Sequence, residues 1–346
     1  LRVSERVKPS QRLQFATFEQ DEALKNFAQV HSYSSIKRLK DRLVDGSNAQ
    51  IFALLDDVKD YLDTDEIIGE QEESLNGALK KTEKEIESMN AFTRMPGGTE
   101  LGSFYHRIME ELLDKWSMQA FDYKEWVLME AKNFGLNEPQ QFQFYHWVER
   151  MMNVPLFDDI TISKLKKGQI IIEKPFSLSV KPYQVDALYE LIRSNKLSSN
   201  MEIGTQEGQQ SDIKKGLLAN LEHSNNTISA GFLKGFIDLS FEHEDIYYIL
   251  DYKTNFLQGN EAYSPDSLNE HMVRLSYDIQ GHLYSLAMHK FLTAYKKNYA
   301  YQQHFGGYYY VFVRGLSADN HRQGIHFCRP SEQRIKEMEV ILNGNY

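Results

Sequence analysis

The stretch GFLKGFIDLSFEH (231–243), with DIYYILDYKTN (245–255) directly after it, decides the fold that this chain can adopt. Both segments are rich in Ile, Leu, Phe and Tyr, and a short polar turn separates them. Runs of this kind are typical of neighbouring β-strands. We therefore expect two strands that are able to pair as a hairpin.

Two carboxylates stand out because they lie within the apolar runs, Asp238 in GFIDLSF and Asp251 in YYILDYK. A carboxylate in such a run is costly unless it is paired, hydrogen-bonded or bound to a metal. Side chains alternate between the two faces of a strand, so Asp251 and Lys253 share a face and Tyr252 points the other way. If the strands pair as a hairpin, Asp238 falls beside Asp251, and two carboxylates and an ammonium occupy one small volume.

This combination of charges suits the hydrolysis of phosphodiester bonds. Carboxylate oxygens are hard ligands for Mg²⁺, and the bound metal activates water and screens the charge of the phosphate. A lysine beside the metal positions the attacking hydroxide or stabilises the transition state. The alternative is a structural Asp–Lys ion pair on a strand, and the D-x-K spacing alone does not decide between the two.

The segments that follow the hairpin alternate between helix and strand. We expect a helix over roughly 269–297, strands at 306–315 and 324–329, and a closing helix at 331–342. The run GGYYYVFVRG (306–315) is almost continuously apolar, as in a strand that is covered on both faces.

The segments that precede the hairpin begin at the clear break MPGG (95–98). Apolar residues recur at helical spacing after it, and one β-branched segment, IIIEKPFSLSV, predicts a strand whose Pro175 suits an edge or a bend. The expected elements are helices at 99–116, 118–135, 139–153 and 183–194, a strand at 170–180 and a loop at 201–227. Strands interleaved with helices predict an α/β sheet domain from about 96 to 346.

Residues 1–95 are expected to be helical and linker-like, and one part of them is strongly acidic. The segment 56–87 holds 12 acidic and 4 basic residues, so it carries −8 of the net charge of −10. It is either an exposed helix or a mobile linker, and a solvated surface is the simplest interpretation. The net charge alone argues against a nucleic-acid binder. Outside 56–87, however, the chain is nearly neutral, so its charge does not exclude nucleic-acid binding.

The single cysteine, Cys328, excludes several classes of protein. A disulfide framework, a four-cysteine zinc site and a four-cysteine iron–sulfur cluster all need more. No run of 18 apolar residues occurs, so we expect no membrane segment. The chain does not begin with Met, and we expect it to be part of a longer protein.

Four blocks of sequence together closely resemble the RecB-type nuclease domain of the PD-(D/E)XK nuclease superfamily. The resemblance is dense from Gly231 to about Pro330, and thinner at 97–113 and 32–39. It implies an α/β nuclease fold with a central mixed sheet flanked by helices, preceded by a helical N-terminal region. The four blocks are GFLKGFIDL (231–239), ILDYKTN (249–255), YDIQGHLYSLAMHKFL (277–292) and HFGGYYYVFVRG (304–315).

The resemblance also implies a role for individual residues. Asp238 and Asp251 match the two carboxylates that bind the metal, and Lys253 matches the catalytic lysine. The backbone carbonyl of Tyr252 would be a further metal ligand, and His106 matches an upstream histidine ligand.

Gln280 and Tyr284 match a Q-x-x-x-Y motif found beside the active site in this branch of the family. They are four residues apart, so both lie on one face of a helix. An amide and a phenol there would contact a DNA phosphate or orient Lys253. The alternative is core packing with a hydrogen-bonded amide.

The ligand on the helix at 99–116 is open on chemical grounds. His106 and Glu110 are four residues apart and face the same way. Mg²⁺ prefers oxygen, which favours Glu110. The resemblance favours His106, because this histidine stands in the matching G-x-x-x-H position after Gly102.

What the resemblance implies for function is a Mg²⁺-dependent deoxyribonuclease of the exodeoxyribonuclease V type, in which Mn²⁺ can replace Mg²⁺. Its substrate would be single-stranded DNA delivered from duplex ends. Its partners would be RecC-like and RecD-like subunits in the bacterial cytoplasm. The chain lacks G-x-x-x-x-G-K-[ST], so no ATPase site is assigned to it, and 1–95 would be the tail of a helicase region. The second hypothesis is a catalytically silent docking and DNA-guiding module.

Overall fold

The computed structural model describes residues 29–37, 40, 95–116, 122–156, 160–194, 227–257, 261–317, 320 and 322–344. The acidic segment 56–87 and almost all of the loop expected at 201–227 lie outside these residues. Among the described residues, no helix is long and apolar enough to cross a membrane.

Six strands of the described chain form one mixed sheet, in the order β1-β5-β6-β7-β8, with β2 paired to β5 on its other side. The β5–β6 pair is the antiparallel hairpin expected at 231–255. β7 runs parallel to β6, and β8 runs antiparallel to β7. The strands are β1 Gln29–His31, β2 Ile170–Val180, β5 Gly231–His243, β6 Ile246–Lys253, β7 Phe305–Phe312 and β8 Ile325–Cys328, and a separate pair comprises β3 Tyr183–Gln184 and β4 Thr227–Ile228.

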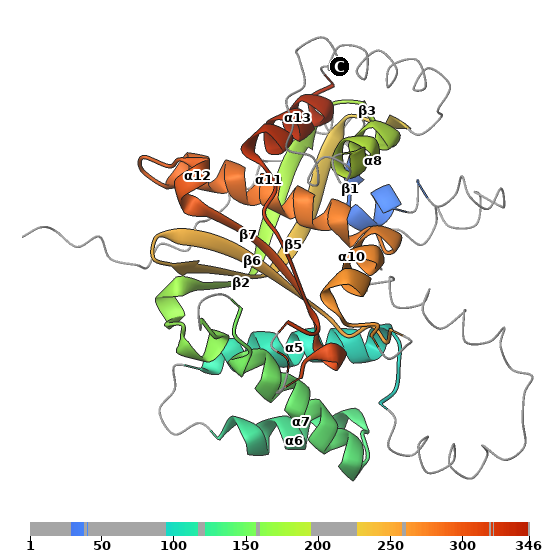
Figure 1. Cartoon of the computed structure of the whole chain (residues 1–346), viewed down its shortest axis with the longest axis vertical. Helices are drawn as coiled ribbons and strands as arrows, with labels where there is room; N and C mark the ends of the chain where they lie inside the picture. Colours follow the sequence, from blue (N-terminus) through green and yellow to red (C-terminus); the bar gives the residue numbers. More distant parts are fainter. Residues whose placement is uncertain are drawn as a thin grey trace, which may run out of the picture.

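Helices cover both faces of this sheet, which confirms the predicted α/β fold (Figure 1). One core lies between the sheet and α8, α10, α11 and α13, and the other between the sheet and α5, α6 and α7. The helices are α5 Thr99–Lys115, α6 Tyr123–Phe134, α7 Glu138–Asn153, α8 Val185–Ser194, α10 Pro265–Arg274, α11 Tyr277–Tyr295, α12 Tyr301–His304 and α13 Glu332–Leu342, with short 3-10 turns at Ile162–Lys164, Lys167–Gln169 and Val313–Gly315.

The alternation of side chains on the central strands explains why two cores form. On β7, Tyr308 and Tyr310 point into the core under α11, whereas Tyr309 and Val311 point into the core under α5. All residues of β7 are buried, as predicted for a strand that is covered on both faces. Burying each of these side chains contributes about 1.5–3 kcal/mol, so the centre of the sheet is firmly anchored.

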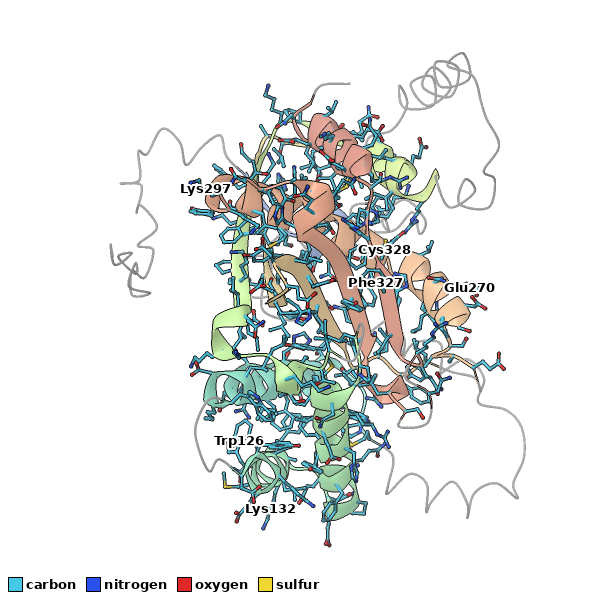
Figure 2. All side chains as sticks on the ribbon, turned by 60° about the vertical axis from the view of Figure 1, so that its left-hand side comes forward. Trp126, Lys132, Glu270, Lys297, Phe327 and Cys328 are labelled. Atoms are coloured by element: carbon cyan, nitrogen blue, oxygen red, sulfur yellow. The ribbon has the colours of Figure 1, made fainter. Side chains whose placement is uncertain are left out.

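The layer of α5, α6 and α7 is held together by aromatic side chains. Phe104 of α5 stacks on Phe134 of α6, with 4.2 Å between the ring centroids. Near the other end of α6, the Lys115 ammonium of α5 lies 4.3 Å from the centre of the Trp126 ring. Lys132 on the same helix is exposed to solvent (Figure 2).

The single helix expected at 269–297 is wrong, because the chain forms α10 and α11 with a turn between them. Ser276 has φ 61° and ψ 16°. A non-glycine residue in this left-handed conformation cannot continue a right-handed helix. The turn is stabilised by Arg193, which donates hydrogen bonds to the Val273 carbonyl and to Ser276 Oγ.

β1 lies in the N-terminal part of the chain yet joins the sheet. Its residues Gln29–His31 pair in parallel with Gly231–Leu233 at the start of β5. Residues 33–37 after it are helical, and Ile36 is fully buried in the core under α11. The domain boundary at 95/96 stays a prediction, and at least this short segment before it packs with the sheet.

Candidate active site

The candidate site lies at a fork in the sheet. One edge of β5 pairs with β1 up to Leu233 and with β6 from Leu239 onward. Between these two ladders, residues 234–238 pair with no described strand on that edge. Asp238 stands where the fork opens, and its Oδ2 accepts a hydrogen bond of 3.2 Å from the backbone N–H of Tyr252. The hairpin therefore places Asp238 at the end of β6, where it contacts the backbone of Tyr252, the residue after Asp251.

Asp251 and Lys253 lie on the part of β6 beyond its ladder with β5, which ends at Leu250. Here β6 keeps only its parallel pairing with β7, with Asp251 opposite Tyr310. Lys253 Nζ lies 3.1 Å from Asp251 Oδ2, and both side chains are almost fully buried. The same ammonium lies 4.5 Å from the centre of the Tyr277 ring. The predicted D-x-K pair is therefore an ion pair on one face of the strand, held in an aromatic setting.

His106 reaches the fork from α5. This helix begins at Thr99, directly after Gly98, whose φ of 102° is accessible to a glycine. His106 Nδ1 lies 3.4 Å from Asp238 Oδ2, and Nε2 lies 3.1 Å from the Tyr252 carbonyl oxygen. The imidazole thus contacts two of the groups that were predicted to surround a metal. Glu110, the alternative on the same helix, is exposed.

Electrostatics at the fork act strongly on His106. Burial lowers its pKa, but the negative charge of Asp238 and the hydrogen bond to that carboxylate raise it more, and the result is a pKa of about 9. Lys253 opposes this rise and Asp251 adds to it. The imidazole therefore titrates in an environment dominated by carboxylates.

Glu173 completes the group, and the sequence did not reveal it. It lies on β2, between the ladder pairs Ile172–Leu239 and Lys174–Ile237, and hence beside Asp238. Its φ of 44° is unusual for a residue within a strand. Burial, followed by repulsion from Asp238, raises the pKa of Glu173 to about 7. The available signal was one more carboxylate within a β-branched run, in IIIEKPF.

His106, Glu173 and Asp238 form a group whose ligand atoms lie within 4.8 Å of one another. Two carboxylate oxygens and an imidazole nitrogen suit a divalent cation such as Mg²⁺ or Mn²⁺. The raised pKa of Glu173 fits as well, because a cation would relieve the crowding of the two carboxylates. Asp251 lies outside this group and contacts Lys253, and the Tyr252 carbonyl lies against His106.

Gln280 and Tyr284 share one face of α11, as their spacing predicted. Gln280 Nε2 donates to Tyr284 Oη at 3.0 Å, and Gln280 Oε1 accepts from Tyr310 Oη at 2.7 Å. Both side chains are buried. Tyr310 is the residue opposite Asp251 in the sheet, and its ring centre lies 5.8 Å from Lys253 Nζ. The pair is thus connected to the ion pair through Tyr310.

Arg314 joins the two elements that carry the site. Its guanidinium donates to the carbonyl of Thr254, which follows Lys253, and to the carbonyl of Pro96, three residues before α5. It also lies 4.9 Å from the centre of the Trp147 ring. This side chain therefore ties the end of β6 to the start of α5.

Comparison with known proteins finds several relatives, each described as RecBCD enzyme subunit RecB. The protein from Buchnera aphidicola subsp. Schizaphis graminum is 31% identical over 262 residues, which are 75% of this chain and 20% of the relative. The Escherichia coli K12 protein is 31% identical over 254 residues, 72% of this chain and 20% of the relative. The Haemophilus influenzae protein is 27% identical over 296 residues, which are 84% of this chain and 21% of the relative. The chain thus spans about a fifth of the length of these relatives, and no family model matches it.

Proposed function

The chain is a relative of RecB subunits over about three-quarters of its length, and from this premise we propose that it is a metal-dependent DNA nuclease of the RecB type. It would hydrolyse phosphodiester bonds in DNA during the processing of double-strand breaks for recombinational repair. The observation that supports this best is the meeting of His106, Glu173 and Asp238 beside the buried Asp251–Lys253 pair.

Under this proposal, His106, Glu173 and Asp238 hold the metal, which would be Mg²⁺, with Mn²⁺ as a substitute. Asp251 and the Tyr252 carbonyl are further ligands by the resemblance to the family. When bound, the cation supplies an activated water and screens the negative charge of the scissile phosphate. His106 must be neutral to bind it, so binding displaces the proton that Asp238 stabilises on the imidazole.

Lys253 supplies a fixed positive charge to the reacting phosphate. The carboxylate of Asp251 and the face of the Tyr277 ring hold the ammonium in place, so little reorganisation is needed when charge develops in the transition state. Gln280 assists indirectly, because its hydrogen bond fixes the ring of Tyr310 beneath the same ammonium.

The proposed substrate is single-stranded DNA that is delivered from duplex ends in the bacterial cytoplasm. In the longer protein, RecC-like and RecD-like subunits would be the partners. The described chain would contribute the cutting step, of the exodeoxyribonuclease V type. We assign no ATP-hydrolysing site to this fragment, so its own cutting should not need ATP.

The experiment is a cutting assay on end-labelled single-stranded DNA without ATP. Mg²⁺ or Mn²⁺ should support cutting, whereas Ca²⁺ should bind and support little, because its looser coordination positions water poorly. Excess EDTA should stop the reaction. Glu110→Ala, an exposed change on the same helix, is the comparison for His106→Ala and should reduce cutting much less. Strong cutting in EDTA would refute the proposal.

A further inference from the structure

The half of β5 that precedes Asp238 presents one face to solvent. Phe232, Lys234 and Phe236 alternate along it and are exposed, with 41% and 46% of the two Phe side chains accessible. Leu233 and Ile237 point the other way and are buried in the core under α11. Large apolar side chains are normally buried, so two exposed rings on one strand call for an explanation.

The neighbouring strands extend this surface. The register of β1 and β2 sets Val30 and Ser179 beside Phe232, Ser177 beside Lys234, and Pro175 beside Phe236. We call these seven side chains the open face. All are exposed, and they include one lysine, two hydroxyls and no carboxylate, in a chain with 49 acidic residues. The open face is therefore a locally non-acidic surface on an acidic protein.

The open face leads directly to the candidate site. Asp238 follows Phe236 by two residues on the same strand, which corresponds to about 7 Å along β5. Phe232 and Phe236 are separated by about 13 Å on the same scale, with Lys234 between them. A polymer that places one phosphate at Asp238 and continues along β5 therefore passes over both rings and the ammonium.

Spaced aromatic rings with a cation between them fit single-stranded nucleic acid better than a protein partner. Unpaired bases stack on aromatic side chains of an open sheet, and cations contact the phosphates between them. The core of a protein interface is depleted in charged residues, whereas here a lysine separates the rings. We propose that the open face is a stacking platform that holds single-stranded DNA on its way to the fork. This inference rests on the proposed nuclease function and adds the surface that selects unpaired bases.

The test measures the Kd of the full chain for two strands of equal length and charge, oligo(dT) and an oligonucleotide made only of abasic sites. EDTA is present so that no cutting occurs. Phe232→Ala/Phe236→Ala should raise the Kd for oligo(dT) by about tenfold or more, since stacking contributes about 1–3 kcal/mol per base. The Kd for the abasic strand should not change. Lys234→Gln should instead raise the Kd for both strands by the same factor, because the Lys234 ammonium contacts phosphate, which both strands have.

Two controls separate a lost ring from a damaged fold. Phe232→Tyr/Phe236→Tyr keeps both rings and should bind oligo(dT) like the wild type. Tyr295→Ala removes an exposed aromatic ring from α11, away from the open face, and should also bind normally. Loss of oligo(dT) binding in the alanine variant alone would support the platform.

Three results would decide against the platform. An unchanged Kd for oligo(dT) in the double alanine variant would overturn it. An equal loss on the abasic strand would also overturn it, because bases would not be the contact. Equal Kd values of the wild type for both strands would overturn it as well, because the bases would then add nothing to binding. A wild-type chain that binds in this base-dependent way but does not cut in Mg²⁺ would reject the nuclease function and leave the platform standing.

Discussion

Two ion pairs in this molecule each set a basic side chain against a buried aspartate, and they differ in their surroundings. Arg193 and Asp278 join α8 to α11, with Nε 3.2 Å from Oδ2. The guanidinium also donates to the Val273 carbonyl and to Ser276 Oγ, while the N–H of Ile279 donates to Asp278 Oδ1. This network closes the turn between α10 and α11.

The Asp251–Lys253 pair lies instead beside a fork that gathers His106, Glu173 and Asp238. Here burial and the charge of Asp238 raise the pKa of Glu173, and Asp238 raises the pKa of His106 against the effect of burial. The difference shows that burial of a charged pair does not by itself identify a site. Shifted pKa values that neighbouring charges cause are more typical of a functional site, and they distinguish the fork from the Arg193–Asp278 pair.

The largest expected effect is the loss of cutting in Lys253→Ala. Removing one well-placed electrostatic group typically lowers the rate by about 10²–10³-fold. Metal binding should stay largely intact, because an ammonium is not a ligand. Single-turnover cutting and Mn²⁺ titration measure the two properties separately. Near wild-type turnover would contradict the assigned role of the lysine.

Arg193→Ala should show the opposite pattern. It removes the ion pair of the buried Asp278, and we expect the free energy of unfolding to fall by about 1–3 kcal/mol. Turnover per folded molecule should stay near that of the wild type. Urea unfolding and the cutting assay on the same sample provide the comparison. A severe loss of turnover without loss of stability would show that the two pairs are not different in kind.

The assignment of the metal ligands is tested by His106→Ala and Glu173→Gln. Each should weaken Mn²⁺ binding by about tenfold or more, because each removes a ligand atom from the group around Asp238. Glu110→Ala, on the exposed side of α5, should change it little. Calorimetric titration of the three variants decides the question. Loss of metal in Glu110→Ala with none in His106→Ala would reverse the choice made here.

A smaller and graded effect is expected from pH. In the metal-free protein, the pKa values of His106 and Glu173 are about 9 and about 7. Protons compete with the metal for both groups, so metal affinity should rise with pH from below 7 to about 9. The rise should be at most about tenfold per pH unit for each proton displaced. Titrations in buffers of different ionisation enthalpy count the protons released, and a pH-independent affinity would contradict the proposed ligands.

The hairpin and its D-x-K spacing were predictable because both depend on local patterns. Period-2 alternation places Asp251 and Lys253 on one face, and the short turn brings Asp238 alongside. The same holds for Gln280 and Tyr284, whose helical spacing fixes their common face. Each of these pairs is close in sequence, so the backbone geometry alone determines how the side chains meet.

Glu173 was not predictable, because its position depends on the pairing of β2 with a strand more than 50 residues away in sequence. Its left-handed backbone, at φ 44°, is also not encoded by a glycine or asparagine. The end of α10 and the start of α11 at Ser276 were not predictable from the sequence for a related reason. A serine does not by itself signal the end of a helix, and Arg193, which stabilises the turn, comes from a distant helix.

The short ladder between β1 and β5 has a consequence for the order of folding. Gln29–His31 pair with residues about 200 positions later in the chain, so forming this ladder closes a very long loop. The β5–β6 hairpin needs only a local turn, and such local contacts form faster than distant ones. Asp238 and Asp251 should therefore be brought together before β1 docks. We expect a ladder of only three residues to open early in local unfolding, and its release would free the edge of β5 while Asp238 stays hydrogen-bonded to β6.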